Sequence, residues 1–191
     1  MTSLLVFAVL ANMPPPPLIE GERDQKAAER AKAVLAPFKK SMKETLTRAL
    51  ETSPEAAIEV CSKKAPELAK AAAKDGVVVG RAANRLRNPE NKPPEWVVPV
   101  MEELSKAAPN TEATKVVRLA GGKRGYAEAI WVADQCTLCH GATVTPQIDA
   151  KLKAAYPKDN ARGYKTGDFR GVFWAEVGPL PARPVAPQQS Q

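Results

Sequence analysis

The chain has 191 residues, of which 44% are hydrophobic and 26% are charged. This is an ordinary globular composition with enough length for one sizeable core, so we expect a single folded domain. The formal net charge of +7 indicates an anionic partner, surface or cofactor. Aromatic residues make up only 5% of the chain, and the basic residues are interspersed with acidic ones, which argues against nucleic-acid binding.

The first 11 residues predict an export signal. An apolar run from Leu4 to Ala11 is too short to span a bilayer and ends in a small residue, as signal peptidases require. No Lys or Arg precedes this run, so the alternatives are a weak signal, a misplaced start codon or an ordinary hydrophobic chain end. Residues 12–22 include four consecutive prolines and predict a stiff spacer. We therefore expect a periplasmic or otherwise exported protein with no transmembrane span in its mature form.

Two helices are expected after the spacer. Residues 21–51 are rich in Ala, Leu, Glu and Lys with apolar residues at helical spacing, and Pro37 is expected to kink or divide this helix. A second helix is expected to start at Pro54 and to stop at Gly76. Steps of three and four residues between its apolar positions place Cys61 on the buried face of this helix.

After Gly76 the pattern changes to short segments of β-branched or alternating apolar residues. Four segments predict strands, at residues 76–82, 115–120, 126–132 and 171–177. Helices followed by short antiparallel strands with long connections predict an α+β domain. The Pro-rich residues 178–191 show no core-forming pattern, and we expect them to be disordered.

The segment DQCTLCHGAT, residues 134–143, contains Cys136, Cys139 and His140, the one histidine of the chain. Two cysteines three positions apart lie on one face of a helical turn, with about 5–6 Å between their Cβ atoms. Each thiol can then add to one vinyl group of the same haem. His140 follows about 100° further round the turn and can direct a ring nitrogen at the iron. The C-x-x-C-H spacing therefore predicts covalent attachment of one haem c.

Three other uses of these residues are weaker. A redox dithiol of this spacing begins a helix in a βαβ unit, whereas the residues before Cys136 predict an antiparallel strand. A zinc ion would need all three cysteines and His140, and the adjacent Cys139 and His140 cannot easily both reach one tetrahedral ion. A disulfide would leave His140 without a role. Export also agrees with haem, because covalent haem attachment takes place on the outer side of bacterial membranes.

The second axial position of the iron has no histidine to fill it. The candidates are Cys61, Met42, Met101, a lysine, a water molecule or no ligand. Periodicity alone favours a packing role for Cys61 as a small core residue. Lys63 and Lys64 are close to Cys61 in sequence, and their positive charge is expected to favour a thiolate.

Four segments resemble a family of bacterial c-type haem domains with a PAS-like fold, first described from a thermophilic cyanobacterium. They are AAIEVCSKKAPELA (56–69), VGRAANRLRNPENKPPEW (79–96), DQCTLCHG (134–141) and AAYPKDNARGYKTGDFRG (154–171), in matching order and spacing. The resemblance covers residues 23–177, and it implies N-terminal helices packed on a PAS-like antiparallel sheet. It also implies the following roles: haem attachment through Cys136 and Cys139, iron ligation by His140 and the Cys61 thiolate, and a haem-facing loop with Arg81, Arg87 and Asn88. We expect the arginines of this loop to bind the haem propionates.

Two function classes follow from these residues. Many members of the family carry this domain ahead of a kinase or chemoreceptor module, whereas both ends here are Pro-rich, so a sensor would act through a separate partner. In a redox or gas sensor, iron reduction or a diatomic gas such as CO or NO displaces Cys61. In a small electron carrier, both ligands stay and the basic surface docks on an acidic redox partner. We do not expect an enzyme such as a peroxidase, because no second imidazole is present to help break an O–O bond.

Overall fold

The computed structural model describes residues 20–180, and its first element is a 33-residue helix, α1 (Glu20–Thr52). Ala27, Ala31 and Leu35 follow one face of α1 at helical spacing and are fully buried. Glu20 and Glu22 occupy the first turn, where negative charge is favourable for the helix dipole. Pro37 lies inside α1 without ending it, so the expected division at this proline does not occur.

The expected second helix consists of α2 (Pro54–Glu59), a π-helical segment η2 (Val60–Lys64) and α3 (Ala65–Ala72). Ser53 caps α2 by accepting a hydrogen bond from the backbone nitrogen of Ala56 at 3.1 Å. In η2 the Ala65 N–H donates to the Val60 carbonyl, five residues back. Pro66 has no N–H and cannot form the next helical bond, which explains the irregular turn at this position.

Four antiparallel strands form one sheet in the order β1-β4-β3-β2. Their bounds are β1 (Val77–Ala82), β2 (Thr114–Arg118), β3 (Arg124–Trp131) and β4 (Phe169–Val177). The four predicted strands are thus confirmed, and the α+β class with them. Alternate residues of β4 face opposite ways: Ala175 and Val177 pack with α1, while Val172 and Trp174 pack with α4 (Val97–Leu104). The sheet therefore has α1 on one face and α4, which we did not predict, on the other.

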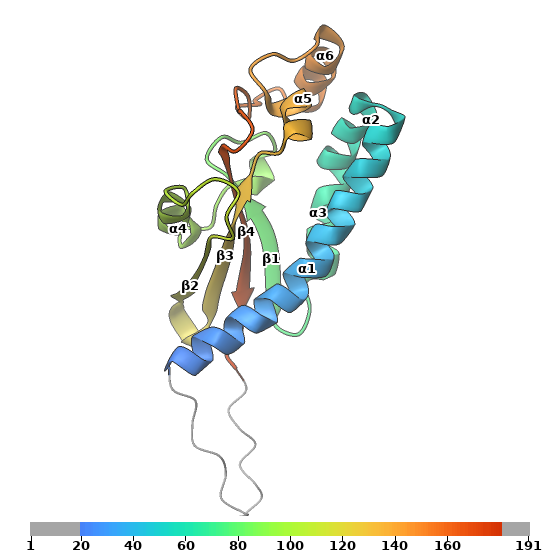
Figure 1. Ribbon diagram of the computed structural model, residues 1–191. Helices are drawn as coiled ribbons and strands as arrows, with labels where there is room; N and C mark the ends of the chain where they lie inside the picture. The colour runs from blue at the N-terminus through green and yellow to red at the C-terminus, as the bar shows by residue number, and fades with distance from the viewer. Residues whose placement is uncertain (1–19, 181–191) are drawn as a thin grey trace, which may run out of the picture.

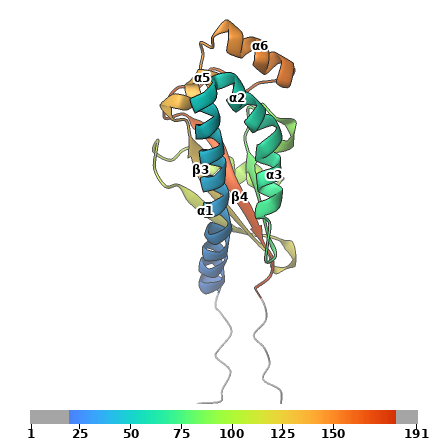
Figure 2. The same ribbon diagram turned by 90° about the vertical axis from the view of Figure 1, so that its right-hand side faces the viewer.

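The C-x-x-C-H segment lies at one end of the molecule. Figure 1 shows α2, α5 (Thr137–His140) and α6 (Pro146–Ala155) gathered beyond one end of the sheet, while both ends of the described chain lie at the opposite end. Figure 2 shows α1 and α3 side by side, and these two helices are in contact. A small apolar cluster joins α2 to α6 and consists of Ile58, Ile148, Leu152 and Tyr156. Helix α1 thus runs from the end where the described chain begins to the end that holds the C-x-x-C-H segment.

The predicted export signal, residues 1–11, lies outside the described residues, as do most of the predicted spacer and most of the C-terminal tail. The start of α1 at Glu20 falls inside the range 12–22 that we expected to form the spacer. Over the described part of the chain, no helix is both long enough and apolar enough to cross a membrane.

Candidate functional site

A cleft that is partly open to solvent lies between the C-terminal half of α1, the segments α2 and η2, and the connection that follows β3, and it encloses about 730 Å³ when the open solvent at its mouth is included. The lining is mainly apolar, with side chains such as Leu46, Leu50 and Ile130. All three cysteines of the chain, its one histidine and three arginines also line this cleft. The predicted site residues thus meet in one place, with the exception of Asn88.

The C-x-x-C-H residues follow β3 in two short helical turns, η5 (Asp134–Cys136) and α5. Thr137 Oγ1 donates a hydrogen bond to the Asp134 carbonyl at 2.6 Å and holds the first turn closed. Gly141 ends α5, and a Cβ atom at this position would lie 2.5 Å from the Thr137 carbonyl oxygen, so the turn requires glycine. Cys136 and Cys139 both line the cleft, as the helical spacing predicts.

His140 is held in the form that can bind a metal. Its Nδ1 atom lies 2.8 Å from the Ala161 carbonyl oxygen, which can only accept, so Nδ1 carries the proton and Nε2 has a free lone pair. Burial, together with the positive charges of Arg87 and Arg170, lowers the pKa of His140 to about 3. The imidazole is therefore neutral at physiological pH, as metal ligation requires.

Cys61 faces the same cleft from η2. The other protein donors considered for the second axial position are elsewhere in the described chain. Met101 is a fully buried residue of α4. The sulfur of Met42 accepts a contact from Arg81 at 3.4 Å, and Met42 does not line the cleft; no lysine of residues 20–180 lines it either. Cys61 is partly exposed and belongs to no buried core cluster, which disfavours the packing role that periodicity suggested.

The charge around Cys61 comes from arginines, and the expected role of the neighbouring lysines is wrong. Lys63 and Lys64 are exposed and form ion pairs with Glu59 and Glu67, at 2.6 and 2.9 Å. Burial raises the pKa of the Cys61 thiol, while the nearby guanidinium groups act in the opposite direction. The groups that favour a thiolate are therefore Arg81 and Arg170 of the sheet and Arg87 of the loop after β1, because the lysines do not line the cleft.

Two arginines of the cleft have buried nitrogen atoms without a partner. The Nε atoms of Arg81 on β1 and Arg170 on β4 are buried, and neither forms a hydrogen bond. Burial lowers the pKa of both side chains. Because arginine keeps its charge in proteins, a buried Nε–H group without an acceptor is unfavourable unless an anionic group binds to it. The cleft is thus suited to a ligand with negatively charged groups.

Arg170 is a site residue that we did not predict. Ile130 pairs with Gly171 and Trp131 pairs with Phe169, so Arg170 is the additional residue of a β-bulge in β4. A bulge redirects a side chain, and here it accompanies an arginine that lines the cleft. Gly171 has a φ of 143°, and a Cβ atom there would lie 2.2 Å from the Ala82 carbonyl oxygen. The DFRG segment that contains Arg170 was the one sequence feature that could have indicated this residue. The bulge itself could not be predicted, because it depends on the register between β3 and β4.

Arg87 and Asn88 occupy different surroundings in the loop after β1. Arg87 lines the cleft, but its guanidinium also pairs with Asp159 at 3.1 Å and donates to backbone carbonyls. The side-chain oxygen of Asn88 accepts a hydrogen bond from the Glu90 backbone nitrogen at 3.0 Å, and Asn88 does not line the cleft. Asn88 therefore caps the short turn η3 (Pro89–Asn91).

The surroundings of the cysteines weaken the alternative uses of the motif. None of the three forms a disulfide. Within residues 20–180, no three or more His, Cys, Asp and Glu side chains are grouped to hold a metal ion, as a zinc site would require. Strand β3 is antiparallel to both of its neighbours, so the βαβ setting of a redox dithiol is absent from this sheet. Burial raises the pKa of Cys139, whereas an attacking thiolate needs a lowered value.

The comparisons with known proteins agree with the resemblance found in the sequence. The profile of the Tll0287-like family, described as Tll0287, matches residues 20–177. The crystal structure of the cyanobacterial heme-protein Tll0287 is similar, with a TM-score of 0.56 and 22% sequence identity, over 78% of this chain and 94% of that one. At this identity the likeness concerns the fold. No curated protein matches the sequence. Because the profile matches well over half of its length, the chain belongs to the Tll0287-like family.

Proposed function

We propose that this protein is an exported c-type haem protein that works as a redox or diatomic-gas sensor through a separate partner. Cys136 and Cys139 would bind the haem covalently, and His140 Nε2 and the Cys61 thiolate would bind its iron. The observation that carries the proposal is that the C-x-x-C-H turn and Cys61, which are distant in sequence, line one apolar cleft. The description of the similar structure as a heme-protein supports it.

The residues of the cleft fit a haem. A haem is a large apolar ring with two carboxylates and an iron atom, and the cleft has an apolar lining, two buried arginine Nε–H groups without an acceptor and two donors suited to iron. When bound, the haem supplies a one-electron redox couple and an axial position at which ligands can exchange. Arg81 and Arg170 would hold the propionates, because their Nε atoms are free to donate. A PAS-like character of the fold is part of the same proposal and is supported by the four-stranded antiparallel sheet.

The location is also part of the proposal. Export is supported by the apolar run at residues 4–11 and by the C-x-x-C-H motif, whose thiols receive haem outside the cytoplasmic membrane. We assign no enzymatic activity, because the one imidazole of the chain is engaged as an iron ligand in this arrangement.

The position of Cys61 in an irregular segment favours a sensor. No residue of η2 is buried, whereas α3 packs on the core through Leu68, Ala69 and Ala72, so the turn that carries Cys61 is held less firmly than the helix after it. Single π-helical turns inside α-helices are frequent at functional sites. Cys61 would be the thiolate ligand of the oxidised form, and it would be free to take up a proton and leave as a thiol once an external donor has supplied one electron. The η2 turn would then shift, and a partner would detect the change.

A small periplasmic electron-transfer cytochrome is the second candidate. The net charge of +7 would favour docking on an acidic redox partner. Leu138, between the two attachment cysteines, is 48% exposed and offers an apolar contact at the edge of the site. In this case both axial ligands stay on the iron in both oxidation states.

Carbon monoxide distinguishes the two candidates. We expect the dithionite-reduced protein to bind CO and to show a sharp shift of its Soret absorption band, because Cys61 has left the sixth position. The Met42→Leu variant should respond in the same way, since Met42 does not line the cleft. An unchanged spectrum of the reduced protein under CO would contradict the sensor and favour the electron carrier.

Removal of a propionate-binding arginine should lower the reduction potential. Loss of a positive charge near the haem disfavours the reduced form, which carries one more electron. At a distance of about 8 Å and an effective dielectric constant of about 20, this loss corresponds to about 2 kcal/mol, or on the order of 90 mV. We expect Arg81→Gln and Arg170→Gln each to show a decrease of this order in a spectroelectrochemical titration. Arg118→Gln is the control, because Arg118 is an exposed residue of β2 that does not line the cleft. Equal potentials in all these proteins would rule out the propionate role.

A further inference from the structure

The loop from Asp159 to Tyr164 holds His140 at three points. The Ala161 carbonyl accepts the Nδ1–H hydrogen bond at 2.8 Å. The Tyr164 backbone nitrogen donates to the His140 carbonyl at 2.9 Å. The Tyr164 ring packs edge-on against the imidazole, with 6.2 Å between ring centroids and 84° between ring planes. The position of this loop therefore determines where the imidazole lies and which of its nitrogens is protonated.

Arg87 ties this loop to the C-x-x-C-H turn. Its guanidinium donates to the Ala161 carbonyl at 3.3 Å and to the Cys139 carbonyl. The Ala161 oxygen thus accepts hydrogen bonds from both Arg87 and His140. Because a carbonyl oxygen has two lone pairs, it can serve both donors, and a fixed position of Arg87 leaves the second lone pair for the imidazole.

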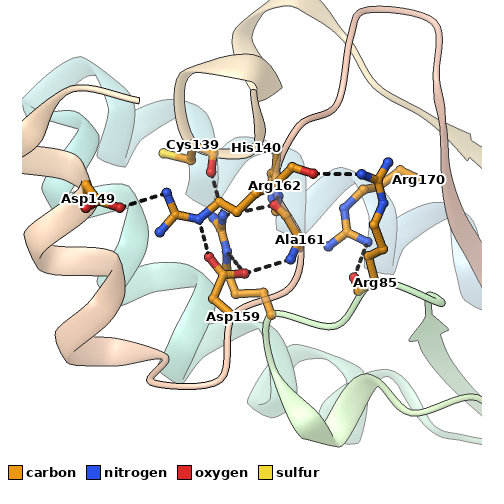
Figure 3. Close-up of polar contacts among 9 residues, drawn as sticks. Arg85, Cys139, His140, Asp149, Asp159, Ala161, Arg162 and Arg170 are labelled. Atoms are coloured by element: carbon orange, nitrogen blue, oxygen red, sulfur yellow. Dashed lines mark hydrogen bonds and ion pairs between the residues drawn. The ribbon is translucent and has the colours of Figure 1, made fainter. Parts of the chain in front are cut away.

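Asp159 fixes the orientation of Arg87. Its side chain is only 4% exposed and accepts hydrogen bonds from Arg87 Nε at 3.1 Å and from the Ala161 backbone nitrogen at 2.9 Å. Figure 3 shows the Asp159 carboxylate directed at the guanidinium of Arg162, which in turn reaches Asp149. The carboxylate therefore binds the loop that contacts His140 and the arginine that supports this loop.

We propose that Arg87 and Asp159 are positioning residues for His140, acting through the Ala161 carbonyl. Neither residue needs to touch the iron, and the chain of contacts runs from Asp159 to Arg87, to the shared oxygen and to Nδ1–H. Outer-shell hydrogen bonds of this kind set the tautomer, orientation and basicity of a metal-binding histidine. The link to iron rests on the proposed role of His140 as a ligand, while the effect on the imidazole itself does not.

The imidazole can be observed directly, because the chain has one histidine. In the full-length protein as purified and fully reduced, labelled with ¹⁵N-histidine, we expect a single Nδ1–H tautomer whose proton exchanges slowly with water. In Asp159→Asn, which keeps the shape of the side chain and removes its charge, exchange should be ~10-fold faster or more, because the charge-assisted hydrogen bond that holds Arg87 is lost. Asp149→Asn is the matched control and should leave exchange unchanged, because Asp149 reaches the network only through Arg162 and is 32% exposed.

A second variant covers the case in which Asp159→Asn fails to fold. Arg87→Lys keeps the positive charge but cannot bind Asp159 and two carbonyls with one planar fork, so it should also accelerate the exchange. Unchanged exchange in the variants that fold, as judged by circular dichroism, would overturn the inference. Haem content is measured separately by absorbance. If the purified protein contains no haem and the variants still exchange the Nδ1 proton faster than the unmutated protein, the positioning role is supported and the proposed haem function is contradicted.

Discussion

Replacing Cys61 with alanine should convert the ferric protein from low-spin to wholly or partly high-spin and should raise its reduction potential. A thiolate donates charge to the iron and stabilises the ferric state, so its loss favours reduction. Axial ligands set haem potentials over a range of about 0.8 V, and we expect an increase on the order of 0.1 V or more. Absorption and electron paramagnetic resonance spectra of the ferric protein report the spin state, and a redox titration reports the potential.

The controls for this result come from the other sulfur donors. Met42→Leu and Met101→Leu should remain low-spin, because neither methionine lines the cleft. Cys136 and Cys139 are unaffected in Cys61→Ala, so the variant should also keep its covalent haem. A fully low-spin ferric spectrum in Cys61→Ala would show that another group binds the iron, and it would leave Cys61 without a ligand role.

The double variant Cys136→Ala, Cys139→Ala should lose covalent attachment entirely. After production in a host with c-type haem maturation, the unmutated protein should keep its haem on a denaturing gel, because thioether bonds survive unfolding. The double variant should release haem into acidified organic solvent, and each single variant should keep one thioether. Both attachment cysteines line the same cleft as His140, which is the geometry that these bonds need.

Cys61→Ala serves as the matched control here, since it removes a cleft thiol outside the C-x-x-C-H turn. Its haem should stay on the polypeptide after denaturation. Extraction of haem from the unmutated protein by acidified solvent would contradict the covalent attachment. It would also exclude the c-type assignment, although binding through His140 and Cys61 could still be tested by the spectra described above.

Several features of this protein followed from the sequence because they depend on residues close together in the chain. The apolar spacing in residues 21–51 predicted α1, and alternating or β-branched segments predicted all four strands. The C-x-x-C-H turn is equally local: Gly141 closes it, and spacing alone places Cys136 and Cys139 on one face. Helix α6 could also have been predicted, because Thr145 caps it and Pro146 occupies its first turn. Residues 97–104 were missed as α4, since Pro99 interrupts a short apolar run.

Other features were decided only by contacts between distant segments. The sequence left Cys61, Met42 and Met101 as competing donors, and the packing of α1 and α4 on opposite faces of the sheet placed Cys61 alone of the three in the cleft. The bulge that accompanies Arg170 depends on the register between β3 and β4. The pairing of Arg87 with Asp159 joins residues 72 positions apart. Periodicity shows which face of a helix or strand is apolar, but it does not show which elements pack against one another. The choice of the second axial donor and the hydrogen bonds that hold His140 both depend on this packing.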